Sequence, residues 1–266
     1  MLDAVAARCS TGHHFDRGRG GHLNLQVGGR LGSSATSGDT AESLAARRRF
    51  LRAGHYAPIA AAVAAAVGEV DGPVLDVGCG EGWYLSQLPV APGAGHGLDI
   101  SKAAVQMAAR AYPDSQFVVG TAYRLPVLDR SLERVVSVFA PQPFDEFARA
   151  LRPGGRWVVA TPGPTHLREM RPVREGEAAD REAERLARRS EPPPGATRVE
   201  HVQCTLHLDA AAAHDLYAMT PIRYQRGGRV AGAGEARAGG ADAPEGPATV
   251  TVDVWVASGD AAVATG

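Results

Sequence analysis

The chain contains few cysteines and almost no lysine. Its three cysteines, Cys9, Cys79 and Cys204, are widely spaced in 266 residues, which does not favour a disulfide framework. We therefore expect reduced thiols, and a metal site would also have to use histidines. Lys102 is the only lysine, so the basic side chains are otherwise arginines. We attribute this uniform use of arginine to coding composition rather than to selection for phosphate binding.

Long apolar runs and a strong net charge are also missing. No run of about 18 uninterrupted strongly apolar residues occurs, and the start of the chain lacks a basic region followed by an apolar stretch. We therefore expect a cytoplasmic protein with no membrane partner. The net charge of -1 gives no general argument for nucleic-acid binding. However, residues 1–60 hold eight arginines and four acidic residues, an excess of +4, so the remaining residues must carry -5.

The length and the 44% apolar content are typical of one substantial globular core with a small appendage. Residues 1–38 are rich in Gly, Arg, His and Ser and show little periodicity. A helix should begin at Asp39 as N-cap, with Glu42 three positions later, and continue to Val67. We expect an interruption at 54–58, because Pro58 disfavours helical geometry at the residue before it.

From Pro73 onward, predicted strands and helices alternate. This alternation predicts right-handed crossovers and an α/β fold with a mostly parallel seven-stranded sheet and helices on both faces. A charged helix and an extended linker are expected over 174–200, and the Gly/Ala-rich stretch 226–247 is expected to be mobile. The predicted strands are 73–77, 95–99, 116–119, 134–138, 155–160, 199–207 and 248–256, and the predicted helices are 82–88, 102–111, 143–150 and 209–218.

A glycine-rich turn follows the first of these strands, in the sequence VLDVGCGEGW from Val74 to Trp83. Glycine lets the backbone approach a ligand closely, because it lacks a side chain and accepts positive φ. The third glycine comes one residue earlier than in the dinucleotide fingerprint G-x-G-x-x-G, which argues against a pyrophosphate ligand. The pattern instead predicts S-adenosylmethionine, with Asp76 or Glu81 near its cationic methionine end and the backbone of Gly78, Gly80 and Gly82 beneath it.

Two further elements follow in the order that this interpretation requires. Asp99, followed by Ile100, closes the next strand about twenty residues downstream, where a carboxylate can accept hydrogen bonds from both ribose hydroxyls. The segment from Thr121 to Pro126, which includes Leu125, follows the third strand, where we expect the adenine. The alternative is that the glycines form only a tight turn and that Asp99 caps the next helix. Cys79 is interpreted as a small buried residue rather than as a nucleophile.

Several longer segments carry a resemblance to a known family. The sequence resembles the RlmA family of ribosomal RNA guanine-N1 methyltransferases, which includes relatives that confer macrolide resistance in antibiotic producers. The resemblance implies that Tyr56 and His166 contact the cofactor together with Gly80 and Glu81. Without it, Tyr56 would be interpreted as a packed aromatic and His166 as a loop histidine. The matching segments are Cys9–Phe15, Gly21–Leu25, Gly38–Asp39, Ala46–Pro58, Ala140–Pro141, Ala160–Leu167 and Met219–Pro221.

In that family an N-terminal zinc ribbon with the ligands C-x-x-C and C-x-x-x-H helps to hold the RNA. Cys9 and His13 match the second half, whereas the eight residues before Cys9 contain no first half. Tetrahedral structural zinc needs four ligands. Three alternatives remain: an upstream start, substitution by His14, His22 or water, or loss of the metal. The resemblance thus divides the chain into an incomplete zinc-ribbon-like module (1–38), linking helices (39–72) and a methyltransferase domain (73–266).

The resemblance implies 23S ribosomal RNA as the partner, and a homodimer is a family-level expectation. RNA recognition would need a base presented from a loop or flipped out of its stack. Arginines would hold the phosphates, although a run of arginines can also be only a solvated helix face. Phe139–Gln142 follows the fourth strand, where acceptors usually lie, and no residue is marked for removal of the guanine N1 proton. The arginines considered are Arg17, Arg19, Arg30, Arg47, Arg48 and Arg49.

Two other functions fit the same scaffold. One is methylation of a small natural product, which would not need a complete ribbon. The other is non-catalytic binding of the cofactor or of RNA. Methylation of stripped ribosomal RNA, with mapping of the modified base, separates these alternatives.

Overall fold

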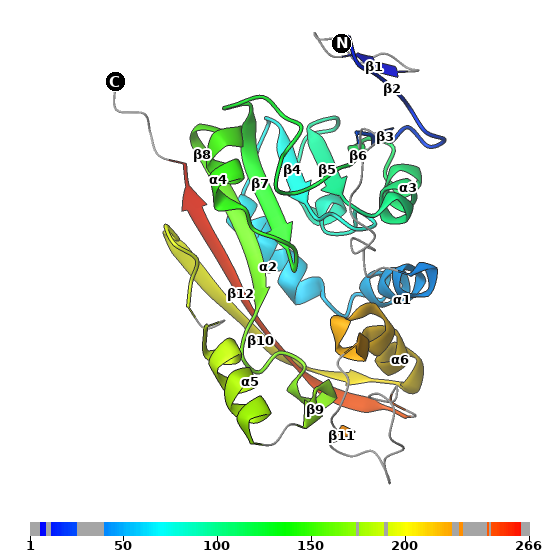
Figure 1. The fold of residues 1–266 in the computed structure, drawn as a ribbon, viewed down its shortest axis with the longest axis vertical. Helices are drawn as coiled ribbons and strands as arrows, with labels where there is room; N and C mark the ends of the chain where they lie inside the picture. Colours follow the sequence, from blue (N-terminus) through cyan, green and yellow to red (C-terminus); the bar gives the residue numbers. More distant parts are fainter. Residues whose placement is uncertain are drawn as a thin grey trace.

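A computed structural model describes most of the chain and organises it around one large sheet (Figure 1). The described residues are 6–8, 12–25, 40–173, 176–188, 191–224, 229–230, 244 and 246–261. Eight strands hydrogen-bond in the order β10-β12-β8-β7-β4-β5-β6-β3. The strands from β3 to β8 are parallel to their neighbours, whereas β12 and β10 are antiparallel. The predicted α/β architecture with a mostly parallel sheet is therefore confirmed.

The observed elements follow the predicted alternation of strands and helices. The parallel part of the sheet consists of β4 (Val74–Val77), β5 (Gly95–Asp99), β6 (Gln116–Val119), β7 (Leu132–Val138) and β8 (Leu151–Pro162). The antiparallel strands are β10 (Arg198–Leu208) and β12 (Ala248–Asp260). The helices are α1 (Ala41–Arg52), α2 (Ala57–Val67), α3 (Lys102–Ala111), α4 (Phe144–Ala150), α5 (Glu177–Arg188) and α6 (Ala210–Met219).

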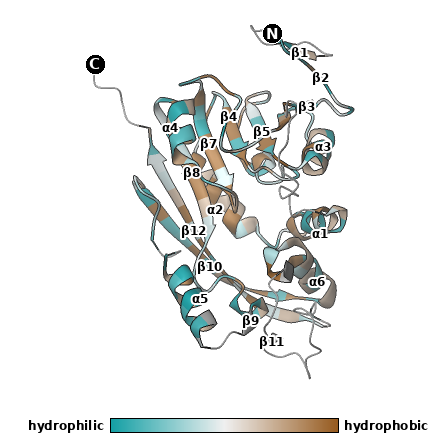
Figure 2. Ribbon diagram, in the orientation of Figure 1, coloured by the Kyte–Doolittle hydropathy of each residue, from teal (hydrophilic) through white to brown (hydrophobic). Residues whose placement is uncertain are grey.

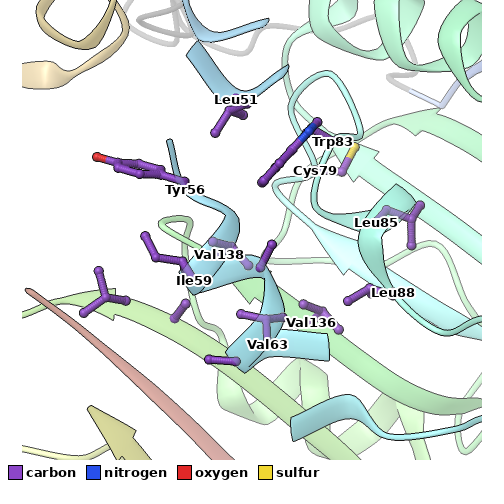
Figure 3. Packing of buried hydrophobic residues seen from close by; sticks show 14 of the residues in the cluster. Leu51, Tyr56, Ile59, Val63, Cys79, Trp83, Leu85, Leu88, Val136 and Val138 are labelled. Atoms are coloured by element: carbon purple, nitrogen blue, oxygen red, sulfur yellow. The ribbon is translucent and has the colours of Figure 1, made fainter. Parts of the chain in front are cut away.

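Apolar side chains cover both faces of the sheet, because successive residues of a strand point to opposite sides. Val136 and Val158 lie on the face that packs against α2, in the cluster that holds Ile59 and Val63 (Figure 3). Val135 and Val159 lie in the opposite cluster with Phe147 of α4. The central strands and α2 are accordingly the most apolar elements, and α5 is strongly hydrophilic (Figure 2).

The structure corrects three expectations about the main sheet and its flanks. The sheet has eight strands rather than seven, because β3 (Leu23–Asn24) pairs in parallel with β6 at its edge. The expected helix at 82–88 is only a 3-10 turn, η1 (Leu85–Gln87), since Gly82 has a positive φ and Pro89 follows shortly after. Helix α1 has Thr40 as N-cap, with its hydroxyl accepting from the Ser43 N–H, and Asp39 lies outside the described residues.

The remaining elements are short and lie outside the large sheet. The strands β1 (Ala6–Arg8) and β2 (His14–Asp16) form a hairpin, and β9 (Pro172–Val173) pairs with β11 (Arg229–Val230). The 3-10 turns η2 (Arg168–Met170) and η3 (Pro221–Tyr224) follow β8 and α6. Most of 226–247, which we expected to be mobile, lies outside the described residues.

Helix α1 packs beside α6, and one ion pair joins the two helices (Figure 1). The Arg49 guanidinium donates two hydrogen bonds to Asp215, from Nε at 2.9 Å and from Nη2 at 2.5 Å. The Asp215 side chain is largely buried. Within the described residues no single helix is long and apolar enough to cross a membrane, and α1 with α2 meet that test only as a pair bent by 79°.

We predict that Arg49→Ala lowers the free energy of unfolding by about 1–2 kcal/mol, between the values for exposed and buried ion pairs, because the largely buried Asp215 side chain loses its partner. Urea denaturation measures the change. Arg52→Ala, on the same helix and exposed, is the control. An equal effect of the two substitutions would show that the ion pair does not stabilise the helix contact.

Candidate functional site

A cavity of about 810 Å³ opens at the carboxyl ends of the parallel strands. Open α/β sheets bind ligands at this edge. Its walls come from the glycine turn after β4, the ends of β5 to β8, helix α1 and the segment that follows it, one residue of α5, and the segment at the end of α6. Side chains in its wall include Arg47, Tyr56, Glu81, Tyr84, Asp99, Ile100, Thr121, Phe139, Gln142, Thr161, His166, Arg171, Arg185 and Thr220.

The glycine turn is held against the ends of two neighbouring strands. The N–H groups of Gly78 and Cys79 donate to the Leu98 carbonyl at 2.7 and 3.0 Å. Gly78, Gly80 and Gly82 all have positive φ. A Cβ at Gly78 would lie 2.3 Å from Cβ of Ala140, so the Ala140 methyl group rests directly on this backbone. The turn therefore has the positive φ values expected of its glycines, and Gly78 leaves room for Ala140; the approach of this backbone to the cofactor stays a prediction.

Asp99 ties the end of β5 to the glycine turn. Its Oδ2 accepts from the Gly80 N–H at 2.9 Å, and its Oδ1 accepts from the Ser101 N–H at 2.7 Å. The N-cap of α3 is Ser101, whose hydroxyl accepts from the Ala104 N–H. Asp99 is thus not the side chain that caps α3, and its carboxylate lies in the cavity wall.

Three carboxyl groups crowd the turn, and one of them is fully buried. Burial, followed by repulsion from Asp99 and Glu81, raises the pKa of Asp76 to about 7. Atom Oδ2 of Asp76 has no hydrogen-bond partner among the described residues. The Arg47 guanidinium lies 3.7 Å from the Glu81 carboxylate. This wall of the cavity therefore favours a cationic ligand.

Aromatic rings form another part of the cavity wall. The ring centroid of Phe139 lies 5.7 Å from that of His166, in a stacked arrangement, and 6.4 Å from that of Tyr84. Tyr56, at the start of α2, lies about as close to both Phe139 and His166, at 6.1 and 6.2 Å. Burial raises the pKa of Tyr56 far above its usual value, so its hydroxyl stays protonated.

Asp253 of β12 organises the loop that carries His166. Its carboxylate accepts from the Thr165 N–H at 2.7 Å, from the Thr165 hydroxyl at 2.5 Å and from His201 Nε2 at 2.7 Å. Its backbone N–H donates to His166 Nδ1 at 3.2 Å. These hydrogen bonds hold the pKa of the Asp253 carboxyl below its usual value despite its burial. In a neutral His166 ring, an accepting Nδ1 leaves the proton on Nε2.

Eight of the eleven residues predicted to bind the cofactor lie in the cavity wall. The other three are Asp76, Gly82 and Leu125. Asp76 and Leu125 are buried behind the wall, and Gly82 packs against the rings of Phe117 and Tyr112. Sequence analysis did not find Arg47 as a cavity residue, nor Tyr84 or Asp253. The one available signal for Asp253 was an acid inside the otherwise apolar strand ATVTVDVWV.

The predicted RNA-binding arginines point to different places. Arg47 lies in the cavity wall, Arg48 lies beside Glu81 and Trp83, and Arg49 binds Asp215. Arg17 donates to the Gln116 side chain at 2.8 Å, at the amino end of β6 and so at the sheet edge opposite to the cavity. Arg19 is exposed, and Arg30 lies outside the described residues.

The predicted zinc ligands are only partly within the described residues. His13 is exposed in the segment before β2, and Cys9 lies outside the described part. Among the described residues, no group of three or more His, Cys, Asp or Glu side chains is arranged to hold a metal. Zinc binding by Cys9 and His13 stays a prediction.

Comparisons with known proteins agree with this geometry. Residues 74–155 match the model of a methyltransferase domain. The chain is 40% identical over 225 residues to a Micromonospora griseorubida protein named provisionally as a 23S rRNA (guanine-N1)-methyltransferase, covering 75% of each chain. It is 34% identical over 228 residues to the 23S rRNA (guanine(748)-N1)-methyltransferase of Streptomyces fradiae, covering 82% of this chain and 80% of that one.

The structure of this chain also resembles solved structures. The YcgJ protein of Bacillus subtilis aligns with a TM-score of 0.47 at 16% identity, over 78% of this chain and 99% of that chain.

We predict that Gly78→Ala destabilises the protein more than Gly68→Ala. Both glycines have positive φ, but a Cβ at Gly68 meets nothing within 4 Å, whereas one at Gly78 overlaps Ala140. Backbone strain alone costs about 1–2 kcal/mol, and overpacking adds roughly 1–3 kcal/mol. Urea denaturation measures the difference. The double substitution Gly78→Ala with Ala140→Gly should recover the overpacking part, and equal effects of the two single substitutions would contradict the contact.

We also predict that Asp76 makes the ligand-free protein less stable as the pH rises. The pKa of Asp76 is about 7 in the folded protein and 3.8 for an ordinary aspartate, as in the unfolded chain. Between pH 3.8 and about pH 7 the folded chain therefore keeps a proton that the unfolded chain has lost. The free energy of unfolding therefore falls between pH 3.8 and about pH 7, by at most about 1.4 kcal/mol per pH unit. Above that range the contribution of Asp76 to the free energy of unfolding no longer changes with pH.

Unfolding of the native protein and of Asp76→Asn between pH 5 and pH 8 measures this effect. The native protein should lose more stability than Asp76→Asn over that range, and the exposed Asp114→Asn should follow the native protein. Parallel curves for native and Asp76→Asn would rule out the buried proton.

Proposed function

The chain belongs to the family of 23S ribosomal RNA (guanine-N1)-methyltransferases, and we propose that it methylates N1 of a guanine in 23S ribosomal RNA. It is an S-adenosylmethionine-dependent methyltransferase. The observation that carries the substrate proposal is the similarity to two such proteins over at least three quarters of each chain. The proposal for the site rests on the cavity, which is lined by carboxyl groups in one part and by aromatic rings in another.

The residues of the cavity fit S-adenosylmethionine. The hydroxyl of Tyr84, which lies in the cavity wall, is buried and has no hydrogen-bond partner among the described residues, and a polar ligand would satisfy it. The carboxyl groups of the turn suit a ligand with an ammonium group and a sulfonium. When bound, S-adenosylmethionine supplies a methyl group whose bond to a cationic sulfur breaks as the acceptor nitrogen attacks.

We assign the cofactor contacts by the chemistry of each side chain. Asp99 would accept hydrogen bonds from the ribose, and the segment at Thr121 would lie against the adenine. Glu81 would attract the ammonium group of the methionine end, and Arg47 would attract its carboxylate. Arg47 is therefore reassigned from the RNA to the cofactor in this proposal, because it lies beside Gly80 and Glu81.

The acceptor would enter from the aromatic side of the cavity. Methyl transfer to a ring nitrogen needs alignment of that nitrogen and exclusion of water more than covalent help from the protein. Phe139, Tyr56 and His166 exclude water there. Gln142, Thr161, Thr220 and Arg171 offer polar groups around the remaining wall, and they are the candidates to bind a base edge.

Methylation of stripped 23S ribosomal RNA by the purified protein, followed by mapping of the modified base, tests the function. We expect N1-methylguanine at one position. Tight binding of S-adenosylmethionine without an RNA product would refute the proposal, and methylation of a small natural product instead would identify the alternative substrate class.

We predict that Asp99→Ala weakens S-adenosylmethionine binding at least tenfold, because the ribose loses a charged acceptor worth roughly 1.5–3 kcal/mol. Calorimetric titration measures the dissociation constant. Asp99→Asn separates the loss of charge from the loss of the hydrogen bond to the Gly80 N–H, and Asp114→Ala is the exposed control. Unchanged affinity in Asp99→Ala would overturn the assignment.

A further inference from the structure

Phe139 combines an unusual backbone with an unusual exposure. It has φ 55, a left-handed conformation that costs a non-glycine residue free energy and persists only where its surroundings enforce it. Its side chain is 38% exposed, whereas Phe50, Phe117 and Phe147 are almost fully buried. Strained residues of this kind gather at ligand sites, so this combination calls for a functional explanation.

Three contacts enforce the turn at Phe139. Its N–H donates to the Ala160 carbonyl of β8 at 3.0 Å. The next residue, Ala140, rests on the backbone of Gly78. The Ser137 hydroxyl donates to the Pro141 carbonyl at 3.2 Å. The turn is thereby fixed to β8, to the glycine turn and to its own strand.

This turn directs the ring into the cavity rather than into either core. Phe139 lies in the cavity wall and in neither of the two apolar clusters of the sheet. Its ring meets His166, Tyr56 and Tyr84 at centroid distances of 5.7 to 6.4 Å, so neighbouring rings fix its orientation. It also lies at the end of β7, next to β4, between the carboxyl-lined wall and the wall that contains Gln142 and Thr161.

We propose that the exposed ring of Phe139 is the platform on which the acceptor base stacks. This inference rests on the proposed function and adds the residue that receives the base. An aromatic face binds an unstacked nucleobase by about 1–3 kcal/mol and does so for any base, because every base has a π-face. Phe139 therefore supplies affinity and orientation, whereas the polar groups around it supply the choice of guanine.

The test uses Phe139→Leu, Phe139→Tyr and Phe139→Gly in the full chain, with 23S ribosomal RNA and S-adenosylmethionine. We expect Phe139→Leu and Phe139→Gly to lower kcat/KM for RNA at least tenfold, and Phe139→Tyr to lower it much less. The dissociation constant of S-adenosylmethionine should change by less than about threefold in all three, in line with loss of base stacking alone.

Phe139→Gly also distinguishes a loss of RNA binding from a loss of folding stability. Glycine relieves the left-handed strain, so this variant should unfold at a urea concentration no lower than that of Phe139→Leu, while it still loses RNA methylation. Arg130→Gly is the matched control, because Arg130 has φ 53 and lies in the turn before β7, at the far end of the strand from the cavity. It should keep the native kcat/KM.

Each outcome decides the inference. Native-like RNA methylation by Phe139→Gly or Phe139→Leu would overturn it, and so would a parallel loss of S-adenosylmethionine affinity, which would assign the ring to the cofactor. A native protein that binds S-adenosylmethionine but methylates no ribosomal RNA would refute the proposed function itself, and with it the identity of the stacked base.

Discussion

The contact between the Gly78 backbone and the Ala140 methyl group determines how the two halves of the cavity meet. Strands β4 and β7 are parallel neighbours, so their carboxyl ends lie at the same edge of the sheet. Because position 78 has no side chain, the turn after β7 lies directly on the turn after β4. One turn brings carboxyl groups to the cavity, and the other brings the ring of Phe139. A single added carbon at position 78 would push these two walls apart.

The negative charge of the carboxyl groups at the glycine turn is balanced only in part by cationic side chains of the protein. Burial, followed by repulsion from Asp99 and Glu81, raises the pKa of Asp76, and the Arg47 guanidinium lies beside Glu81. A proton on Asp76 avoids both the cost of a buried charge and the repulsion between the carboxylates. A cationic ligand would relieve the same repulsion. The grouped carboxyl groups thus lower the stability of the folded protein and favour binding of a cationic ligand, as functional sites often do.

The features that sequence analysis predicted are local ones. Strand periodicity, the glycine spacing and the acid at the end of β5 each depend on a few consecutive residues, and the structure has all three. Two of the features that it missed are contacts between distant segments. Nothing near Leu23 indicates that two residues of the N-terminal segment extend the sheet beside β6, and nothing near Asp253 indicates that it fixes a loop 88 positions away in the chain. The helix expected at 82–88 failed for a local reason, because the positive φ of Gly82 and the nearby Pro89 leave room for only one 3-10 turn.

The extra strand β3 also fixes where the segment before it lies relative to the cavity. Strand β3 runs parallel to β6, and the segment before it lies at the amino ends of the strands, where Arg17 binds Gln116. The cavity opens at the opposite, carboxyl edge. Arg17 therefore lies at the end of the sheet opposite to the cavity, and RNA binding by Arg17 and Arg19 stays a prediction. The proposed function would divide recognition between the two ends of the strands: stacking and polar contacts would bind one base at the cavity, and phosphate contacts would bind a more distant part of the RNA.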